Sequence, residues 1–428
     1  MADDTTGAAG GTPTGRLTRR LGTRDAVVVG LGSMLGAGVF SAFAPAAAAA
    51  GSGLLLALVV AAVVAGCNAT SSARLAALYP ESGGTYVYGR RRLGDFWGHL
   101  AGWAFVVGKT ASCAAMALTL GAYTAPGHER AAGAAAVVLL AALTYRGVQK
   151  SAAFTRAVVA LVLAVLAFVV VSSLAGGTGG GDRLVVSAGT GVAGVLQGAG
   201  FLFFAFAGYA RIATLGEEVR DPVRTVPRAI AVALGTVLLA YAAVGVTLLL
   251  VLGADGTAAT ASPLRAAVEA GPAAAFAPVV QVGAAAAAAG SLLALLLGVS
   301  RTTLAMARDR HLPRTLAAVH PRTGVPHHAE LAVAAVVVVL VATLDLRGAI
   351  GSSSFGVLAY YAVANACALT LTRAERRPPR WVPVLGLVGC VAVAVSLPAS
   401  SVLGGGLVLL AGALTWAVRR RVSPSAPR

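Results

Sequence analysis

Two glycine-interrupted apolar segments hold the residues of this chain that are best suited to bind a small ligand. The first covers residues 30–40 (GLGSMLGAGVF), and the second covers residues 198–219 (GAGFLFFAFAGYARIATLGEEV). Inside a bilayer each backbone N–H and C=O group needs a partner, because an unpaired group is costly in hydrocarbon. Interrupted helices are tolerated there where the backbone lines a cavity or meets a ligand. Matched breaks in the two halves of a chain point to the binding site of a secondary transporter.

The first segment offers backbone donors to an anion. Gly32, Gly36 and Gly38 each lower helix propensity by about 1 kcal/mol relative to alanine, so local unwinding costs little. A break here frees the N–H groups of Gly36, Ala37 and Gly38, and together with the helix dipole they favour a carboxylate. Close packing between helices is the alternative explanation of the same glycines.

The second segment offers backbone acceptors to a cation. A break at Ala207 and Gly208 leaves the carbonyl groups of Phe206 and Ala207 unpaired, which suits an α-ammonium group. Neighbouring aromatic side chains such as Phe203 and Tyr209 either close over a ligand or pack in the bilayer. An anion site and a cation site on facing backbones together suit a zwitterion.

Two charged residues, Lys109 and Arg211, lie inside apolar segments. Ionisable residues within the membrane are costly and are functional by default unless they reach an interface. Burial disfavours the charged form of a lysine, so Lys109 is a candidate proton-coupling group; a fixed cation that replaces a bound metal ion is the alternative. Arg211 does not titrate and is expected to pair with backbone carbonyls or to extend to the interface.

The elements that position these residues are membrane-spanning helices. The chain of 428 residues is 57% hydrophobic and 11% charged, with a mean hydropathy of +0.82, whereas soluble domains carry about 25% charged residues. Apolar runs of about 20 residues cross the hydrocarbon as helices, and about twelve are present. They cover residues 25–49, 53–73, 96–125, 131–146, 153–175, 193–215, 229–253, 276–301, 329–345, 351–373, 381–397 and 401–418.

Lysine and arginine set the orientation of these spans. With both termini inside, almost all basic residues outside the spans fall on the cytoplasmic side, and the other side receives only Arg130, Arg183, Arg265 and Arg347. The net charge of +17 is therefore a topology signal and does not indicate nucleic-acid binding. Residues 1–22 are expected to form a disordered cytoplasmic tail and residues 421–428 a second tail. Residues 217–230 are expected to form a short cytoplasmic helix, punctuated by two prolines.

Four motifs, in this order, resemble those of the amino acid/polyamine/organocation permeases. They are GSMLGAGVF, PESGGTYVYGRRRLGDFWGHLAGW, FFAFAGY followed by GEEVRDPVRTVPRAI, and SRTTLAMARDRHLPRTLAAVHPRTGVPHHA, and the resemblance covers residues 22–420. It implies an all-α integral membrane protein with a LeuT-type fold and broken first and sixth helices. Residues 23–175 and 193–373 are then inverted repeats of five helices each, and residues 381–420 form two peripheral helices.

The resemblance also implies a secondary active transporter in the cell membrane, surrounded by lipid, that carries amino acids by alternating access. Carried over by position, the substrate-binding residues are Ser33, Met34, Gly36, Ala37, Gly38, Phe206, Ala207 and Gly208. Some proton-coupled members have a lysine in the fifth span, where this chain has Val162. Lys109 is therefore the candidate for coupling to protons, and neutral amino acids are the expected substrates.

Other functional classes fit the sequence less well. A channel needs a continuous polar lining, and a membrane enzyme needs clustered histidines or carboxylates within the spans. No catalytic residue, cofactor or metal site is expected, and the four cysteines are isolated in apolar runs as small hydrophobes. An exchanger, a polyamine or organic-cation carrier, and a transporter-like sensor without flux remain as alternatives. The absence of acidic residues in the middle of the spans disfavours the cation carrier.

Overall fold

The computed structural model describes residues 21–79, 83–147, 152–176, 180–187, 189–213, 219–375 and 377–422. In these ranges the regular structure is helical, and a single parallel bridge joins Leu21 to Val219. The predicted all-α fold class is confirmed. Most of the first predicted tail, residues 1–20, and the end of the second, residues 423–428, lie outside the described residues.

Helices lie at all the predicted spans. The first span is divided into α1 (Thr23–Met34), α2 (Ala37–Ser41) and α3 (Phe43–Ala50), and the sixth into α9 (Val192–Phe206), a 3₁₀ turn (Ala207–Tyr209) and α10 (Ala210–Ala213). The others correspond to α4 (Leu54–Leu78), α6 (Asp95–Thr124), α7 (Glu129–Tyr145), α8 (Ala152–Leu174), α11 (Pro222–Ala258), α13 (Ala277–Arg308), α14 (His327–Thr343), α15 (Leu346–Leu369), α16 (Trp381–Val395) and α17 (Ala399–Val422). Two short helices, α5 (Thr85–Arg92) and α12 (Pro263–Glu269), lie between them. Among the described residues, 8 helical segments are long and apolar enough to cross a membrane, which indicates a multi-pass membrane protein.

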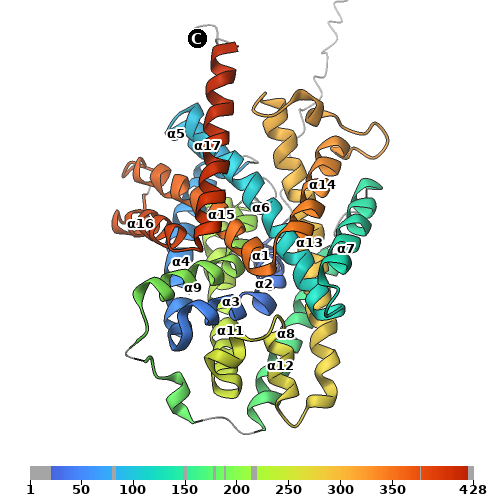
Figure 1. The fold of residues 1–428 in the computed structure, drawn as a ribbon. Helices are drawn as coiled ribbons and strands as arrows, with labels where there is room; N and C mark the ends of the chain where they lie inside the picture. The colour runs from blue at the N-terminus through green and yellow to red at the C-terminus, as the bar shows by residue number, and fades with distance from the viewer. Residues whose placement is uncertain are drawn as a thin grey trace, which may run out of the picture.

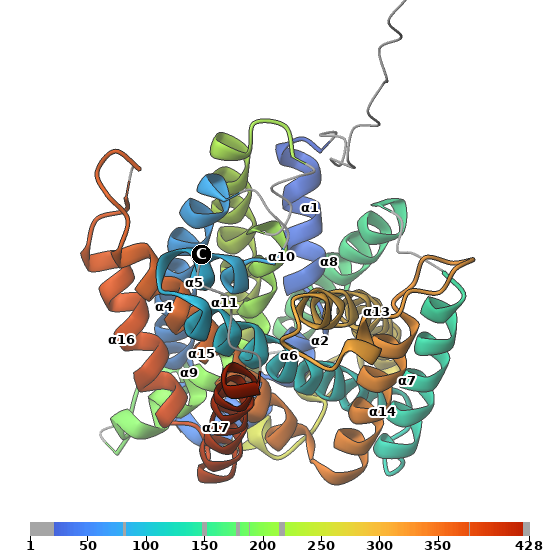
Figure 2. The same cartoon turned by 90° about the horizontal axis from the view of Figure 1, so that it is seen from above.

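The broken first span lies in the interior of the bundle. Figure 1 shows the helices of the bundle, and Figure 2 shows α2 near the centre of the bundle and α1 reaching it between α11 and α8, with α16 and α17 on the outside. The most apolar stretch of α6 is 78% buried, whereas that of α17 is 11% buried. Lys109 lies on α6, so this side chain sits in the interior beside the breaks.

The segment after the sixth span differs from the prediction. We expected a short separate helix over residues 217–230. Residues 214–218 lie outside the described residues, and α11 begins at Pro222, continues through Pro227 and ends at Ala258 after a kink at Gly253. The prediction was wrong because proline is favoured in the first turn of a helix, where its missing N–H costs nothing, so Pro222 starts a long helix.

The boundaries of both tails also shift. Leu21 was assigned to the first tail, but its carbonyl accepts a hydrogen bond of 2.9 Å from the N–H of Arg220 beside the bridge to Val219. The chain is thus fixed at the entrance to α1. At the other end, α17 extends to Val422, so the second tail starts two residues later than predicted.

A buried polar cluster joins helices that are far apart in the sequence. Asn365 of α15 donates to Asn68 of α4 at 2.6 Å and accepts from Ser71 at 2.7 Å. The thiol of Cys390 on α16 donates to Asn68 at 3.3 Å. All four cysteines are buried free thiols. These hydrogen bonds fix the relative position of three helices, because a buried amide without partners would be destabilising by about 1–3 kcal/mol.

Candidate functional site

The first break separates the backbone hydrogen bonds of α1 from those of α2. α1 closes with a hydrogen bond of 2.7 Å from the N–H of Leu35 to the carbonyl of Leu31. Gly36 then leaves the helical region, with φ −98° and ψ −148°, and α2 starts at Ala37. The first N–H groups of a helix have no partner within it. In the part of the chain that the structure describes, no carbonyl group from elsewhere accepts a hydrogen bond from the N–H groups of Ala37 and Gly38.

The second break contacts the first, backbone to backbone. α9 ends at Phe206, and the 3₁₀ turn that follows places Gly208 directly against Ser33 and Met34. A Cβ atom at Gly208 would overlap the carbonyl oxygen of Ser33. The sequence signal of two matched glycine breaks therefore marks two segments that meet in space, and Gly208 is required by this close approach.

Tyrosine hydroxyl groups pair carbonyls that the breaks would otherwise leave free. Tyr241 of α11 lies 2.7 Å from the carbonyl oxygen of Met34 and 3.2 Å from that of Ala205, within donating distance of both. Tyr123 of α6 donates to the carbonyl of Phe40 at 2.8 Å. Sequence reasoning missed both tyrosines. Their signal was a tyrosine within an apolar span, where the hydroxyl needs a partner.

Lys109 points to the second break. Its side chain is only 7% exposed, and Nζ donates to the carbonyl oxygen of Ala207 at 3.4 Å. This is one of the two carbonyls that the sequence assigned to an α-ammonium group. In the structure this acceptor is therefore used by the side chain of Lys109.

The remaining candidates lie around the same point. The Cβ of an alanine at Gly36 would lie 2.8 Å from Oγ of Ser291 on α13, so this helix forms one wall of the break. Ser33 donates to the carbonyl of Val29 at 2.9 Å. Arg211 is exposed on α10, at the far end of the second break, and Val162 is fully buried in α8. Figure 2 shows α2 between α6 and α13, both of which it contacts.

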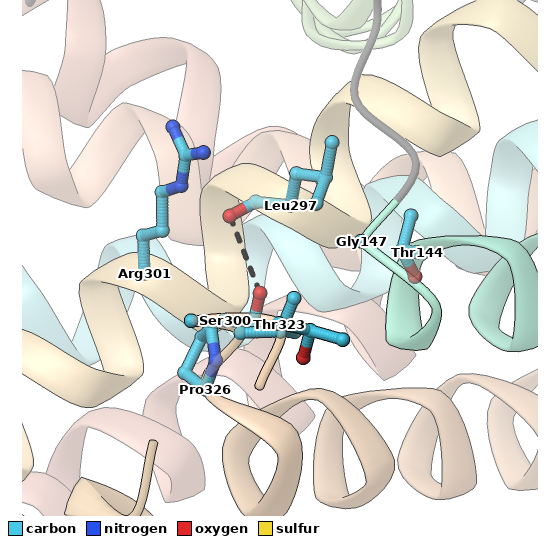
Figure 3. Close-up of a pocket in the computed structure, with 9 residues that line it drawn as sticks. Thr144, Gly147, Leu297, Ser300, Arg301, Thr323 and Pro326 are labelled. Carbon is cyan, nitrogen blue, oxygen red and sulfur yellow. Dashed lines mark hydrogen bonds between the residues drawn. The ribbon is translucent and has the colours of Figure 1, made fainter. Parts of the chain in front are cut away.

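A separate small cavity opens away from the breaks, near the ends of α7 and α13. Thr144, Ser300, Arg301, Thr323 and Pro326 are among the residues that line it (Figure 3). Ser300 donates to the carbonyls of Leu296 and Leu297, at 2.8 and 3.2 Å, so its hydroxyl is already used within α13. The sequence gave no indication of this cavity.

A polar network joins α5, the start of α6 and the end of α13. Arg308 and Arg310 flank Asp309 in the sequence, and Arg90 and Arg419 act on Asp95, so we call this end of the bundle the arginine-rich face. Tyr86 of α5 donates to Asp309 at 2.6 Å, and Arg90 pairs with Asp309 at 2.7 Å and Asp95 at 3.3 Å. His311 is 4% exposed and lies 3.5 Å from Asp95. Burial lowers the pKa of His311 from 6.5 to about 4, although the neighbouring Asp95 acts in the opposite direction.

His311 should make the protein less stable in acid. The unfolded chain takes up a proton near pH 6.5, whereas the folded protein resists it until about pH 4. The contribution of neutral His311 to the free energy of unfolding is therefore complete above pH 6.5. It is lost as the pH falls from 6.5 to about 4. We expect the melting temperature of the purified protein to fall over this range, and to fall less steeply in His311→Gln. The exposed His128→Gln is the matched control; equal slopes in all three proteins would contradict the prediction.

The amino-acid sequence of this chain is similar to sequences of known membrane transporters. The family model described as "Amino acid permease" matches residues 21–413. An uncharacterized transporter of Mycobacterium tuberculosis is 64% identical, over 95% of this chain and 92% of its own. A branched-chain amino acid permease of Bacillus subtilis is 24% identical, over 94% of this chain and 91% of its own. The human cationic amino acid transporter 4 is 30% identical, over 85% of this chain and 61% of its own. The chain therefore belongs to the amino acid permeases of the amino acid/polyamine/organocation superfamily.

Proposed function

We propose that this permease carries neutral amino acids across the cytoplasmic membrane by alternating access, together with protons. The observation that carries the proposal is the contact between the two helix breaks. Unpaired N–H groups of Ala37 and Gly38 face the ligand's carboxylate, and the carbonyl of Ala207 faces its ammonium. Ser33, Met34, Gly36, Phe206 and Gly208 shape the backbone around them.

Several features favour a neutral side chain on the substrate. The residues described in contact with the breaks include Ala205, Tyr241 and Ser291, and none of these three carries the carboxylate that a cationic side chain would need. The similarity to a branched-chain amino acid permease supports the same conclusion. The similarity to a cationic amino acid transporter keeps cationic substrates as the alternative.

Lys109 supplies the proposed link to protons. A charged ammonium makes a stronger hydrogen bond to the carbonyl of Ala207 than a neutral amine does. Loss of the proton therefore weakens the contact between α6 and the second break. Such a change alters the relative stability of the open and closed arrangements, which is what coupling requires.

The proposed architecture follows from the family. Residues 23–175 and 193–373 form two inverted repeats, each beginning with a broken helix, and residues 381–420 form two peripheral helices. The arginine-rich face is cytoplasmic, as the positive-inside rule requires, and both termini lie there.

Reconstitution into liposomes tests this function. We expect labelled leucine and alanine to accumulate under an inward proton gradient without sodium, and the external pH to rise when substrate is added. Uptake only into liposomes preloaded with an amino acid, unaffected by the proton gradient, would indicate an amino acid exchanger. Accumulation of arginine or putrescine alone would indicate the cation carrier. Binding without any flux would indicate a sensor, and strict sodium dependence would exclude proton coupling.

A further inference from the structure

One tyrosine side chain joins the two broken spans. Tyr241 is fully buried in α11, which packs against α1, α3 and the 3₁₀ turn of the second break. Its hydroxyl oxygen lies 2.7 Å from the carbonyl oxygen of Met34, the last residue of α1, and 3.2 Å from that of Ala205, near the end of α9. A hydroxyl group has one hydrogen to donate, so either carbonyl alone would satisfy it. Burial of the hydroxyl therefore does not explain why it reaches both spans.

The aromatic ring of Tyr241 is also held by both spans. Phe43 of α3 meets it edge to face, with ring centroids 6.3 Å apart, and the ring centroid of Phe206, at the end of α9, lies 5.1 Å away. Such pairs are favoured because the positive edge of one ring meets the negative face of the other. Gly245, one turn further along α11, lets Phe43 approach, because a Cβ atom there would lie 3.2 Å from the Phe43 ring. The packed ring therefore keeps the hydroxyl between the two carbonyls.

The contact with Ala205 extends to the proposed carboxylate donors through Gly38. The backbone of Gly38 packs directly on Ala205, since a Cβ atom at Gly38 would lie 2.6 Å from Cα of Ala205. Gly38 follows the first break, whereas Met34 precedes it. By holding Met34 and Ala205 together, Tyr241 thus fixes α2 relative to α1. Ala207, whose carbonyl is proposed to face the ammonium, follows Ala205 by two residues, so the same hydroxyl also fixes the acceptor side.

We infer that Tyr241 is a positioning residue of the substrate site, whose hydroxyl sets the spacing between the backbone groups for the carboxylate and those for the ammonium. Its effect on affinity rests on the proposed function. A zwitterion gains from binding through both of its ends only when the two sets of groups are already held at the matching distance. Without the hydroxyl, each break keeps its own backbone groups, but the two breaks move independently.

Tyr123 of α6 provides a matched control. It is also fully buried, its hydroxyl donates to the carbonyl of Phe40 at 2.8 Å, and its ring meets Phe40 edge to face at 5.7 Å. Both of these contacts are to the first broken span. Tyr241→Phe and Tyr123→Phe therefore each remove one buried hydroxyl and keep the ring, but only Tyr241→Phe removes a link between the two spans.

Hydrogen–deuterium exchange of the purified protein, followed by mass spectrometry, tests the link without any ligand. Backbone amides exchange when the structure around them opens locally, so exchange reports how firmly each break is held. We expect Tyr241→Phe to exchange faster than wild type in peptides from both breaks, residues 31–40 and 203–209. Tyr123→Phe should exchange faster in the first of these only. Faster exchange at one break alone, or at neither, in Tyr241→Phe would overturn the inference.

Thermal-shift titration with three ligands, in the absence of any gradient, tests the consequence for binding. Leucine carries both charged ends, leucinamide keeps only the ammonium, and isocaproate keeps only the carboxylate. We expect Tyr241→Phe to raise the Kd of leucine by about tenfold, the net effect of one hydrogen bond, and to leave the Kd of each single-ended ligand unchanged. In Tyr123→Phe, leucine should keep its full gain over the two analogues.

The outcomes separate a positioning role from a structural one. Equal losses for all three ligands in Tyr241→Phe would show a general loosening of the fold and would overturn the inference, as would an unchanged Kd for leucine. A wild-type protein that binds none of the three ligands would refute the proposed function. The exchange measurement would then still decide whether Tyr241 holds the two breaks together.

Discussion

Lys109→Ala is expected to abolish the accumulation of substrate under a proton gradient while exchange of substrate for substrate persists. The ammonium of Lys109 is buried and donates to the carbonyl of Ala207 at the second break. Without Lys109, no proton binds beside the second break, so the stability of the break no longer depends on protonation. The proton gradient then cannot drive the transport cycle. Substrate should still enter and equilibrate. The measurement compares uptake with and without an imposed gradient, alongside counterflow, in the same liposomes.

Lys109→Arg separates the loss of a titratable group from the loss of the positive charge. Arginine keeps a permanent charge, so it should retain folding and some exchange but block coupling. Thr110→Ala, one position along α6, is the matched control, because the Thr110 hydroxyl donates only to its own helix at Val106. Full gradient-driven accumulation by Lys109→Ala would show that the coupling proton binds elsewhere.

Gly36→Val is expected to abolish substrate binding in a protein that still inserts and folds. A Cβ atom at this position lies 2.8 Å from Oγ and 2.9 Å from Cβ of Ser291, and a branched side chain adds to the overlap. Under the proposed function, it also fills the space that the carboxylate of the substrate needs beside the N–H groups of α2. If the overlap opposes the substrate-bound arrangement of the break by about 3 kcal/mol, Kd rises by more than a hundredfold. Thermal-shift titration with leucine measures the loss.

Two further variants separate the causes of that loss. Gly66→Val on α4 is the matched control, since nothing lies within 4 Å of a Cβ atom there, and it should bind normally. The pair Gly36→Ala with Ser291→Gly removes the overlap with α13 and should recover folding stability. If the pair also recovers full affinity, the carboxylate does not need the space at Gly36. Wild-type affinity in well-folded Gly36→Val would remove the first break from the site.

The local features of the two breaks could be predicted from sequence because they depend on backbone propensity. Glycines at Gly36 and Gly208 favour local unwinding, and the structure interrupts α1 at Leu35–Gly36 and α9 at Ala207. The spans were predictable for a similar reason, since apolar length alone decides whether a helix can lie in hydrocarbon. Their ends were less predictable: Pro222 was read as a breaker but starts α11.

What the sequence by itself determined is therefore the class of the protein, the approximate places of its apolar helices, and the two segments that break. Only the tertiary structure decided which groups meet there. Tyr241, Lys109 and Ser291 reach the breaks from α11, α6 and α13, and no spacing along the chain relates them. Backbone conformation is set largely by neighbouring residues, whereas the partner of a polar side chain is set by how helices pack across the bundle.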